Sequence, residues 1–393
     1  MEMIPFEKAF EIVMNCGFSM GTEVIPFADS LNRVLAEDVF SDMDMPPFNK
    51  SSVDGFACRQ ADLGCDLEIL ETIPAGVWPS KVVGEGQCSR IMTGAPVPDG
   101  ADCVVMVEYT ELSPEGKMRF NGAFTKANIA FKGEDVHKDD IVLKKVRIIS
   151  PQDIAVMALA GHTAVTVSKM PVIAVISSGS ELVEPSEIPS VSQIRNSNSS
   201  QLLAQVSRAG ASGKNYGIAA DDEQQTLSIV QEAISGNEMV IITGGVSMGD
   251  YDFVPSVLER AGVKILFSRV AVQPGKPTTF GLHADAVVFG LPGNPVSSFI
   301  QFELLIRPLI YKMMGHDWRP PISRLPMKER FTRKTADRMA FIPVTTTGDG
   351  FVSPVEFHGS AHISALPDAG GIITMPVGKL VIEKGEIVSV RQI

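Results

Sequence analysis

The stretch that decides the fold reads Thr-Gly-Gly-Val-Ser-Met-Gly-Asp-Tyr-Asp-Phe over residues 243–253, directly after the apolar run 239–242. Two related turns follow, Gln-Pro-Gly-Lys-Pro over 273–277 and Leu-Pro-Gly-Asn-Pro over 291–295. Glycine allows the sharp turns that bring backbone N–H groups close to an anion. Loops at the carboxyl ends of strands build the ligand crevice of an open α/β sheet. We therefore expect the three loops to share one site for a phosphorylated ligand.

Length, composition and charge restrict the class of protein. A chain of 393 residues predicts about two to four domains. Its apolar content of 45% and charged content of 20% are ordinary for a globular protein. The net charge of −12 disfavours a nucleic-acid partner, which would need a basic face. It also means that any anion site must be locally positive.

The cysteines and the first residues of the chain indicate the cellular compartment. There are five cysteines, an odd number, all within the first 103 residues and without a Cys-x-x-Cys pair, which disfavours a disulfide framework or a thiolate zinc site. The first residues lack the basic and apolar regions of a signal peptide, and no apolar run reaches the length of a membrane span. The sequence predicts a cytoplasmic protein without a membrane partner.

Apolar periodicity divides the chain. Between residues 169 and 317, strand-like runs alternate with helical segments, which predicts an α/β domain with a mostly parallel sheet. A helix over 151–161, with Ser150 as its N-cap, follows a long β-rich stretch, as when one domain interrupts another. We expect a discontinuous linking domain (1–45 and 138–168), a β insertion domain (46–137), the α/β domain (169–317), closed by one long helix over 296–313, and a terminal β-barrel or sandwich (318–393).

Acidic residues gather where the strands of the α/β domain are expected to end. Glu181 follows one strand, Asp221 and Asp222 follow another, and Asp250 and Asp252 lie on the first glycine loop. Carboxylate oxygens suit Mg²⁺, which bridges acidic side chains and substrate phosphates. For Asp221 or Asp222 alone, the N-cap of a helix is an equally good interpretation.

Two further features favour an anion. Lys276 stands between Gly275 and Pro277, where a rigid turn would hold its ammonium as a point charge for phosphate or another oxyanion. Asn294 and Pro295 begin the closing helix, whose free N–H groups also favour anions.

The chain resembles the MoeA/gephyrin E-domain family, the molybdopterin molybdenumtransferases, over nearly its whole length. Each matching segment alone is modest evidence. The number of segments and their order along the chain together make the resemblance specific. The matching segments are Leu-Asn-Arg-Val-Leu-Ala-Glu-Asp (31–38), Ser-Ser-Val-Asp-Gly-Phe-Ala (51–57), Arg-Ile-Met-Thr-Gly-Ala-Pro (90–96), Gly-Glu-Asp (133–135), Gly-Ser-Glu-Leu (179–182), Ile-Arg-Asn-Ser-Asn (194–198) and the three loops.

The resemblance implies a fold and a reaction. It implies four domains, with a MogA/MoaB-like α/β domain and a C-terminal β-barrel, in an elongated homodimer. The substrates would be adenylylated molybdopterin and molybdate, used with Mg²⁺, and AMP would be released. The active site would lie between the α/β domain of one subunit and the β insertion of the other. A molybdopterin adenylyltransferase is an expected partner.

The resemblance and the loops together give a set of site residues. Molybdate is a dianion, so the site also needs cations, for which Arg269 and Arg90 are further candidates. The catalytic positions are Asp54, Glu181, Asp221, Asp252, Lys276 and Arg338, of which Glu181, Asp221 and Asp252 would hold the metal. The substrate-binding positions are Thr93, Gly94, Asp135, Asn198, Gly244, Gly245, Ser247, Gly249, Asp250, Pro274, Gly275, Pro292, Gly293, Asn294 and Ser360.

Several positions depart from the family pattern, among them Ser-Ala-His-Ile over 360–363 and Gly370. Gln273 replaces a common lysine, Asn196 a common aspartate and Pro343 a frequent arginine. These changes leave open a catalytically weak pterin-binding scaffold or a tungstate-preferring paralogue. A third alternative is a pterin adenylyltransferase that uses the α/β domain alone, but such a protein would not need the flanking β regions.

Overall fold

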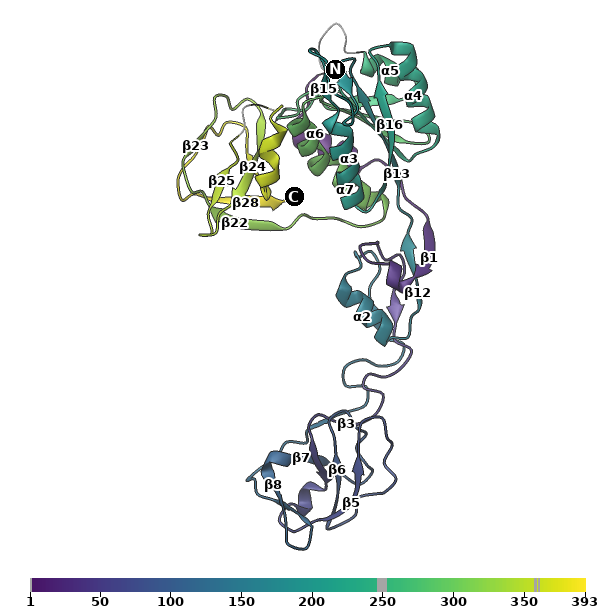
Figure 1. Cartoon of the computed structure of the whole chain (residues 1–393), viewed down its shortest axis with the longest axis vertical. Helices are drawn as coiled ribbons and strands as arrows, with labels where there is room; N and C mark the ends of the chain where they lie inside the picture. Colours follow the sequence, from purple (N-terminus) through teal and green to yellow (C-terminus); the bar gives the residue numbers. More distant parts are fainter. Residues whose placement is uncertain (1, 246–252, 357–358, 360) are drawn as a thin grey trace.

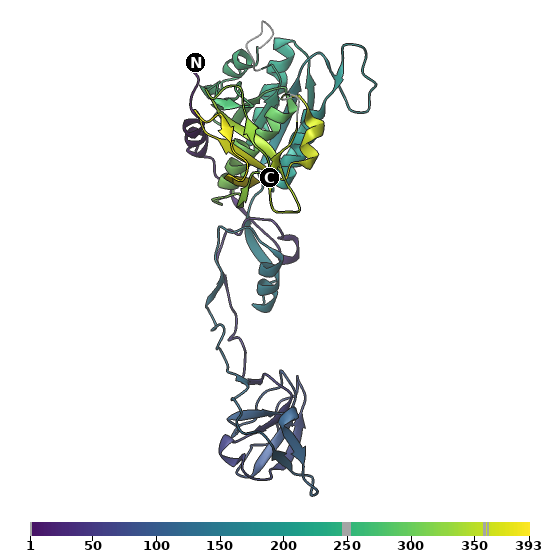
Figure 2. The same ribbon diagram turned by 90° about the vertical axis from the view of Figure 1, so that its left-hand side faces the viewer.

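The computed structural model describes residues 2–245, 253–356, 359 and 361–393. The molecule is elongated (Figure 1 and Figure 2), with the α/β and terminal β regions together at one end and a β region at the other. Between them lie α2 (Pro151–Leu159) and an antiparallel pair formed by β1 (Thr22–Pro26) and β12 (Ala164–Ser168). Across the described residues, no helix combines the length and the apolar character that a bilayer span requires.

A six-stranded sheet forms the centre of the α/β region, in the order β16-β13-β17-β21-β20-β18. The first four strands are parallel, whereas β20 runs antiparallel to both of its neighbours. The predicted mostly parallel sheet is therefore confirmed, although the sequence prediction did not include β20. In sheet order the strands span Ser212–Ala219, Val172–Ser178, Met239–Thr243, Val287–Leu291, Thr279–Leu282 and Lys264–Phe267.

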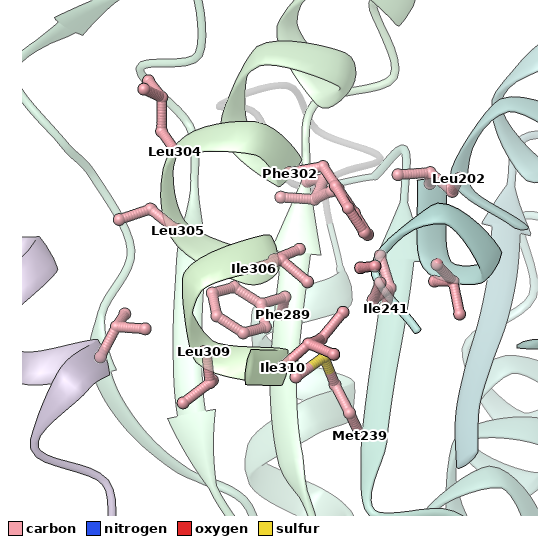
Figure 3. Close-up of a cluster of buried hydrophobic side chains, with 14 of the residues drawn as sticks. Leu202, Met239, Ile241, Phe289, Phe302, Leu304, Leu305, Ile306, Leu309 and Ile310 are labelled. Carbon is pink, nitrogen blue, oxygen red and sulfur yellow. The ribbon is translucent and has the colours of Figure 1, made fainter. Parts of the chain in front are cut away.

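Apolar side chains on both faces of the central strands are buried, as expected for a parallel sheet covered by helices. On one face, Met239, Ile241 and Phe289 project toward the closing helical segment (Figure 3). The helices that cover the sheet are α1 (Phe6–Met14), α3 (Ser197–Arg208), α4 (Glu223–Ser235), α5 (Val254–Arg260), α6 (Pro295–Gln301) and α7 (Arg307–Met313).

The prediction of a single closing helix over 296–313 is wrong in one respect. A π-helical stretch, Phe302–Ile306, separates α6 from α7. Pro308 has no N–H to donate and its ring crowds the preceding turn, so the helix widens just before it. The stretch turns the carboxylate of Glu303 inward, where it pairs with Arg208 at 2.5 Å and Arg307 at 2.9 Å.

Polar side chains cap the starts of α2, α3 and α4, and the cap at Asn196 was not predicted from the sequence. Ser150 and Asp153 form a reciprocal capping box at α2, as expected for Ser150. Asn196 caps α3 through the backbone N–H of Ser199, and Asp222 caps α4 through that of Gln225.

The β region at the far end has a four-stranded sheet in the order β5-β6-β4-β7. A short antiparallel pair, β2 (Val39–Phe40) with β11 (Ile141–Leu143), lies where the chain enters and leaves it. The sheet strands span Glu68–Ile73, Gln87–Ile91, Gly55–Cys58 and Cys103–Met106, and the shorter strands are β3 (Lys50–Ser51), β8 (Thr110–Leu112), β9 (Met118–Phe120) and β10 (Ile129–Ala130).

The terminal region has a sheet in the order β19-β24-β26-β28-β22, with β25 beside β24. Its first strand, β19, precedes the second predicted loop, so this loop connects the terminal sheet to the α/β sheet. Pairing of the described strands follows an open path, and the barrel and the four domain boundaries stay predictions. The strands span Val272–Gln273, Met339–Thr346, Gly371–Met375, Ile387–Gln392, Ile322–Pro326 and Val352–Pro354, with the short strands β14 (Leu182–Val183), β15 (Ile194–Arg195), β23 (Phe331–Thr332) and β27 (Val381–Ile382) elsewhere.

Candidate functional site

A cavity of about 530 Å³ lies at the carboxyl ends of β13, β16, β17 and β21, the edge where the ligand crevice was expected. The first and third predicted loops meet there, but the prediction that all three loops share one site is met only in part, because Pro277 is the only residue of the second loop in the described part of this wall. Arg195, Ala361 and Ile363 also line the cavity and were not predicted. The predicted residues in its wall are Glu181, Asn198, Asp221, Gly244, Gly245, Pro292, Gly293 and Asn294.

Asn198 joins the first loop to the third. Its side-chain amide donates hydrogen bonds to Thr243 Oγ1 at 2.9 Å and to the carbonyl oxygen of Gly293 at 2.7 Å. The Oδ1 atom of Asn198 and the Oγ atom of Ser178 are buried in this wall without a hydrogen-bond partner among the described atoms. A buried acceptor without a donor is costly, so a ligand that donates a hydrogen bond would satisfy it.

The first loop requires glycine for steric reasons. Gly244 has a φ of +95°, and a Cβ atom there would lie 2.1 Å from the carbonyl oxygen of Ser178. Gly293 approaches it from the third loop, since a Cβ atom on Gly293 would lie 3.5 Å from the Cα of Gly244. Glycine is therefore required at Gly244, whereas a side chain at Gly293 would make only an ordinary contact. Glycine loops of this kind can direct backbone N–H groups at an anion.

Two of the predicted metal ligands face the first cavity. Glu181 and Asp221 are exposed in its wall, and Asp221 accepts a hydrogen bond of 3.0 Å from the backbone N–H of Ser180. Asp222 instead caps α4. Of the two neighbouring aspartates, Asp222 is therefore the helix cap and Asp221 the residue in the cavity wall. Both wall residues offer the hard carboxylate oxygens that Mg²⁺ prefers. Among the described residues no group of three His, Cys, Asp or Glu side chains is arranged for a metal.

Five predicted residues lie outside the described residues. One of them is Asp252, the third predicted metal ligand. The five are Ser247, Gly249, Asp250, Asp252 and Ser360.

A second cavity, of about 430 Å³, adjoins the first and shares Pro277, Pro292 and Asn294 with it. The predicted residues Pro274, Gly275, Lys276 and Arg338 line it, together with Gln273 and Arg333. Its described wall thus has three cationic side chains and no carboxylate. This wall therefore carries the local positive charge that an anion site in this acidic chain would need, although Arg338 also pairs with Asp337 at 3.4 Å.

Arg333 was not predicted from the sequence. Its guanidinium donates hydrogen bonds of 2.7 Å to the carbonyl oxygens of Lys379, Arg338 and Pro376. Burial lowers the pKa of this guanidinium from its ordinary value. Only the basic run around residues 328–334 could have signalled it, and such a run usually forms a solvated surface. Arg333 holds the backbone of Arg338 against the cavity.

The departures from the family pattern occupy different places. Gln273 is exposed in the wall of the second cavity. Asn196 is buried and accepts a hydrogen bond of 2.9 Å from Ser177, besides capping α3. Pro343 lies in β24 opposite Ile372 and lines neither cavity. Arg269, a further predicted cation, does not line them either.

The remaining predicted residues lie in or next to the far β region, and among them only Asp54 and Thr93 are joined to each other by side-chain hydrogen bonds. The carboxylate of Asp54 accepts hydrogen bonds from the backbone N–H of Thr93 at 2.6 Å and its hydroxyl at 2.8 Å, and Gly94 follows. These bonds, with a contribution from Arg90, lower the pKa of Asp54. Asp135 is exposed near the entrance to this region. Within one chain this region lies at the other end of the molecule from both cavities (Figure 1).

Three family models match the chain: the MoeA N-terminal region (domain I and II) over residues 4–161, a probable molybdopterin binding domain over 174–312, and the MoeA C-terminal region (domain IV) over 324–393. A Staphylococcus aureus protein named molybdopterin molybdenumtransferase is 35% identical, with 98% of this chain and 95% of the relative covered. A Bacillus subtilis protein of the same name is 34% identical, with 98% and 93% covered. The crystal structure of the molybdopterin biosynthesis MoeA protein from Pyrococcus horikoshii OT3 is similar over 100% of both chains, at 28% identity and a TM-score of 0.87.

Proposed function

This chain belongs to the MoeA family, and from that premise we propose that it inserts molybdate into adenylylated molybdopterin with release of AMP. It is an enzyme of molybdenum cofactor biosynthesis, as its full-length relatives named molybdopterin molybdenumtransferase indicate. One observation supports this reaction best: two adjoining cavities of opposite character share a wall at Pro292 and Asn294. One offers glycine loops and carboxylates, and the other offers cations.

The second cavity is suited to molybdate. Lys276 and Arg338 supply positive charge without a carboxylate in the described wall, and Arg333 fixes the backbone from which Arg338 projects. Without a bound cation, the carboxylates of the first cavity would disfavour a tetrahedral dianion, whereas the cationic side chains of the second cavity would attract it. The exposed amide of Gln273 can donate a hydrogen bond to an oxyanion, although it lacks the charge of lysine.

The first cavity is suited to the phosphate bridge of the substrate. The backbone at Gly244 and Gly293 would approach the phosphates, and Asn198 would hold the two loops together. Glu181 and Asp221 would hold Mg²⁺, which supplies charge stabilisation as AMP leaves when it is bound. These side chains orient the scissile bridge toward the cationic cavity.

The site is incomplete in one chain, so we propose a homodimer. Asp54 and Thr93 belong to the far β region, which lies at the opposite end of the chain from the α/β region whose loops line the cavities (Figure 1). A two-fold dimer of elongated subunits would place these two residues of one subunit against the cavities of the other. Mixing two inactive variants, Asp54→Asn and Asp221→Asn, tests this. One intact site per mixed dimer should restore about a quarter of the wild-type activity after random exchange. No recovery despite exchange would reject the shared site.

The reaction is tested by incubating the chain with adenylylated molybdopterin, Mg²⁺ and either molybdate or tungstate. AMP release and metal in the pterin product are expected with molybdate. Tight pterin binding without AMP release would favour the scaffold alternative, and preference for tungstate would favour the paralogue. We further propose a cytoplasmic location, consistent with five cysteines that are free thiols, and a molybdopterin adenylyltransferase as the supplier of the substrate.

A further inference from the structure

An aromatic pair stands exposed on the far β region. Trp78 is 70% exposed, and its ring meets that of Phe48 edge-on with 5.6 Å between the centroids. Val77 and Val82 beside it are also exposed. A large ring left in water is costly unless a ligand or partner covers it.

The loop that carries Trp78 is fixed rather than loosely placed. The carboxylate of Glu71 accepts hydrogen bonds from the backbone N–H groups of Ser80 at 3.1 Å and Lys81 at 3.0 Å, and from the Ser80 hydroxyl at 2.6 Å. These bonds tie the loop back onto β5. A ring held in place in advance loses little conformational entropy when a ligand stacks on it.

Strand pairing brings this loop to the edge that carries Asp54 and Thr93. β5 and β6 are parallel, with Ile73 opposite Ile91, so the Trp78 loop and the Thr93 loop leave the same end of the sheet. β4 is antiparallel to β6, which places Asp54 at that end too. The Trp78 loop therefore leaves the same end of the sheet as Asp54 and Thr93, the residues that the proposed function assigns to the partner subunit's cavity.

We propose that Trp78, supported by Phe48, is a stacking platform for a planar heteroaromatic ring of the adenylylated pterin substrate. This proposal depends on the proposed function and its dimer. The substrate has a ring system at each end of its phosphate bridge, whereas the described wall of the first cavity contains no aromatic side chain. A substrate ring that extends from the first cavity of one subunit would meet the indole face of Trp78 on the other subunit. Such stacking is strong because it combines apolar contact with the π face.

The test measures the Kd of the full-length chain for adenylylated molybdopterin without molybdate, so that no molybdenum is transferred. Trp78→Ala and Trp78→Leu should each weaken binding about tenfold, whereas Trp78→Phe should stay within about threefold of wild type. Val82→Ala is the matched control, because it removes a neighbouring exposed apolar side chain without removing a ring, and it should bind like wild type.

Three outcomes would overturn the proposal. Wild-type affinity in Trp78→Leu, together with a shift of Trp78→Ala to monomers in sedimentation, would mean that Trp78 contacts a second copy of the chain instead. Equal affinity of all variants, while the wild type binds substrate and releases AMP, would reject the platform and leave the proposed function standing. Failure of the wild type to bind the substrate would reject both.

Discussion

The side-chain amide of Asn198 donates a 2.7 Å hydrogen bond to the carbonyl oxygen of Gly293, which joins the start of α3 to the loop after β21. The same amide reaches Thr243 on the first loop. Asn198→Ala should therefore lower the free energy of unfolding by about 1–3 kcal/mol, because buried acceptors lose their donor. It should also weaken binding of adenylylated molybdopterin, since the two loops are no longer tied. Calorimetric unfolding and a binding titration measure the two effects.

Ser200→Ala is the control for this change, because Ser200 is an exposed residue of the same helix. Equal affinity of Asn198→Ala and Ser200→Ala would contradict the assigned role of Asn198 in the ligand site.

Asp221 and Asp222 provide a matched pair of substitutions at adjacent positions. Asp221→Asn removes a charge from the cavity and should reduce the Mg²⁺-dependent rate at least about tenfold with little change in stability. Asp222→Ala removes the N-cap of α4 and should cost about 1 kcal/mol of stability while the activity is retained. AMP-release rates and thermal unfolding of both variants measure this. The reverse pattern would mean that the two roles are exchanged.

Substitution of Lys276 should affect molybdate and the pterin nucleotide differently. Its ammonium lines the cationic cavity, so Lys276→Ala should raise the molybdate concentration needed for half-maximal rate more than it raises the Kd of the pterin nucleotide. Lys264→Ala, at an exposed lysine outside both cavities, is the control. Equal losses for both substrates would show that the second cavity is not a separate molybdate site.

Much of the α/β region could be predicted from the sequence, because its signals are local. Buried runs such as 239–242, capping residues and glycine loops all depend on nearby residues, and parallel strands must open at one edge. The choice between Asp221 and Asp222 could not be predicted, because the first residue of α4 decides it and helix ends are the least reliable part of such predictions.

The missed features depend on contacts between distant residues. The two-residue strand β19 pairs with β24, some seventy positions later, so the second loop could not be assigned to a boundary between two sheets from its own sequence. The antiparallel strand β20 contains Gly281 and follows a proline-rich turn, and both features weaken a strand signal. Arg333 reaches its carbonyl partners only through the folding of the terminal region.

The Asp54–Thr93 pair should make the stability of the far β region depend on pH. The backbone N–H and then the hydroxyl of Thr93 lower the pKa of Asp54, because both donate to its charged form. A carboxyl with a lowered pKa stabilises the folded state above its unfolded pKa, and this contribution is lost as the pH falls through the folded pKa. Thr93→Val keeps the backbone bond and removes the hydroxyl. It should raise the pKa of Asp54 toward its ordinary value, so that the stability contribution that acid removes is smaller and is fully lost at a higher pH.

A carboxyl-carbon NMR titration of Asp54 in wild type, Thr93→Val and Thr93→Ser measures this shift. The serine variant keeps the hydroxyl and should titrate like wild type. At pH 7 the carboxylate is ionised in all three, since even the ordinary pKa of about 3.9 lies far below that pH. Any loss of AMP release in Thr93→Val at pH 7 therefore does not report the charge of Asp54. An unchanged titration curve in Thr93→Val would show that the backbone bond alone sets the pKa of Asp54.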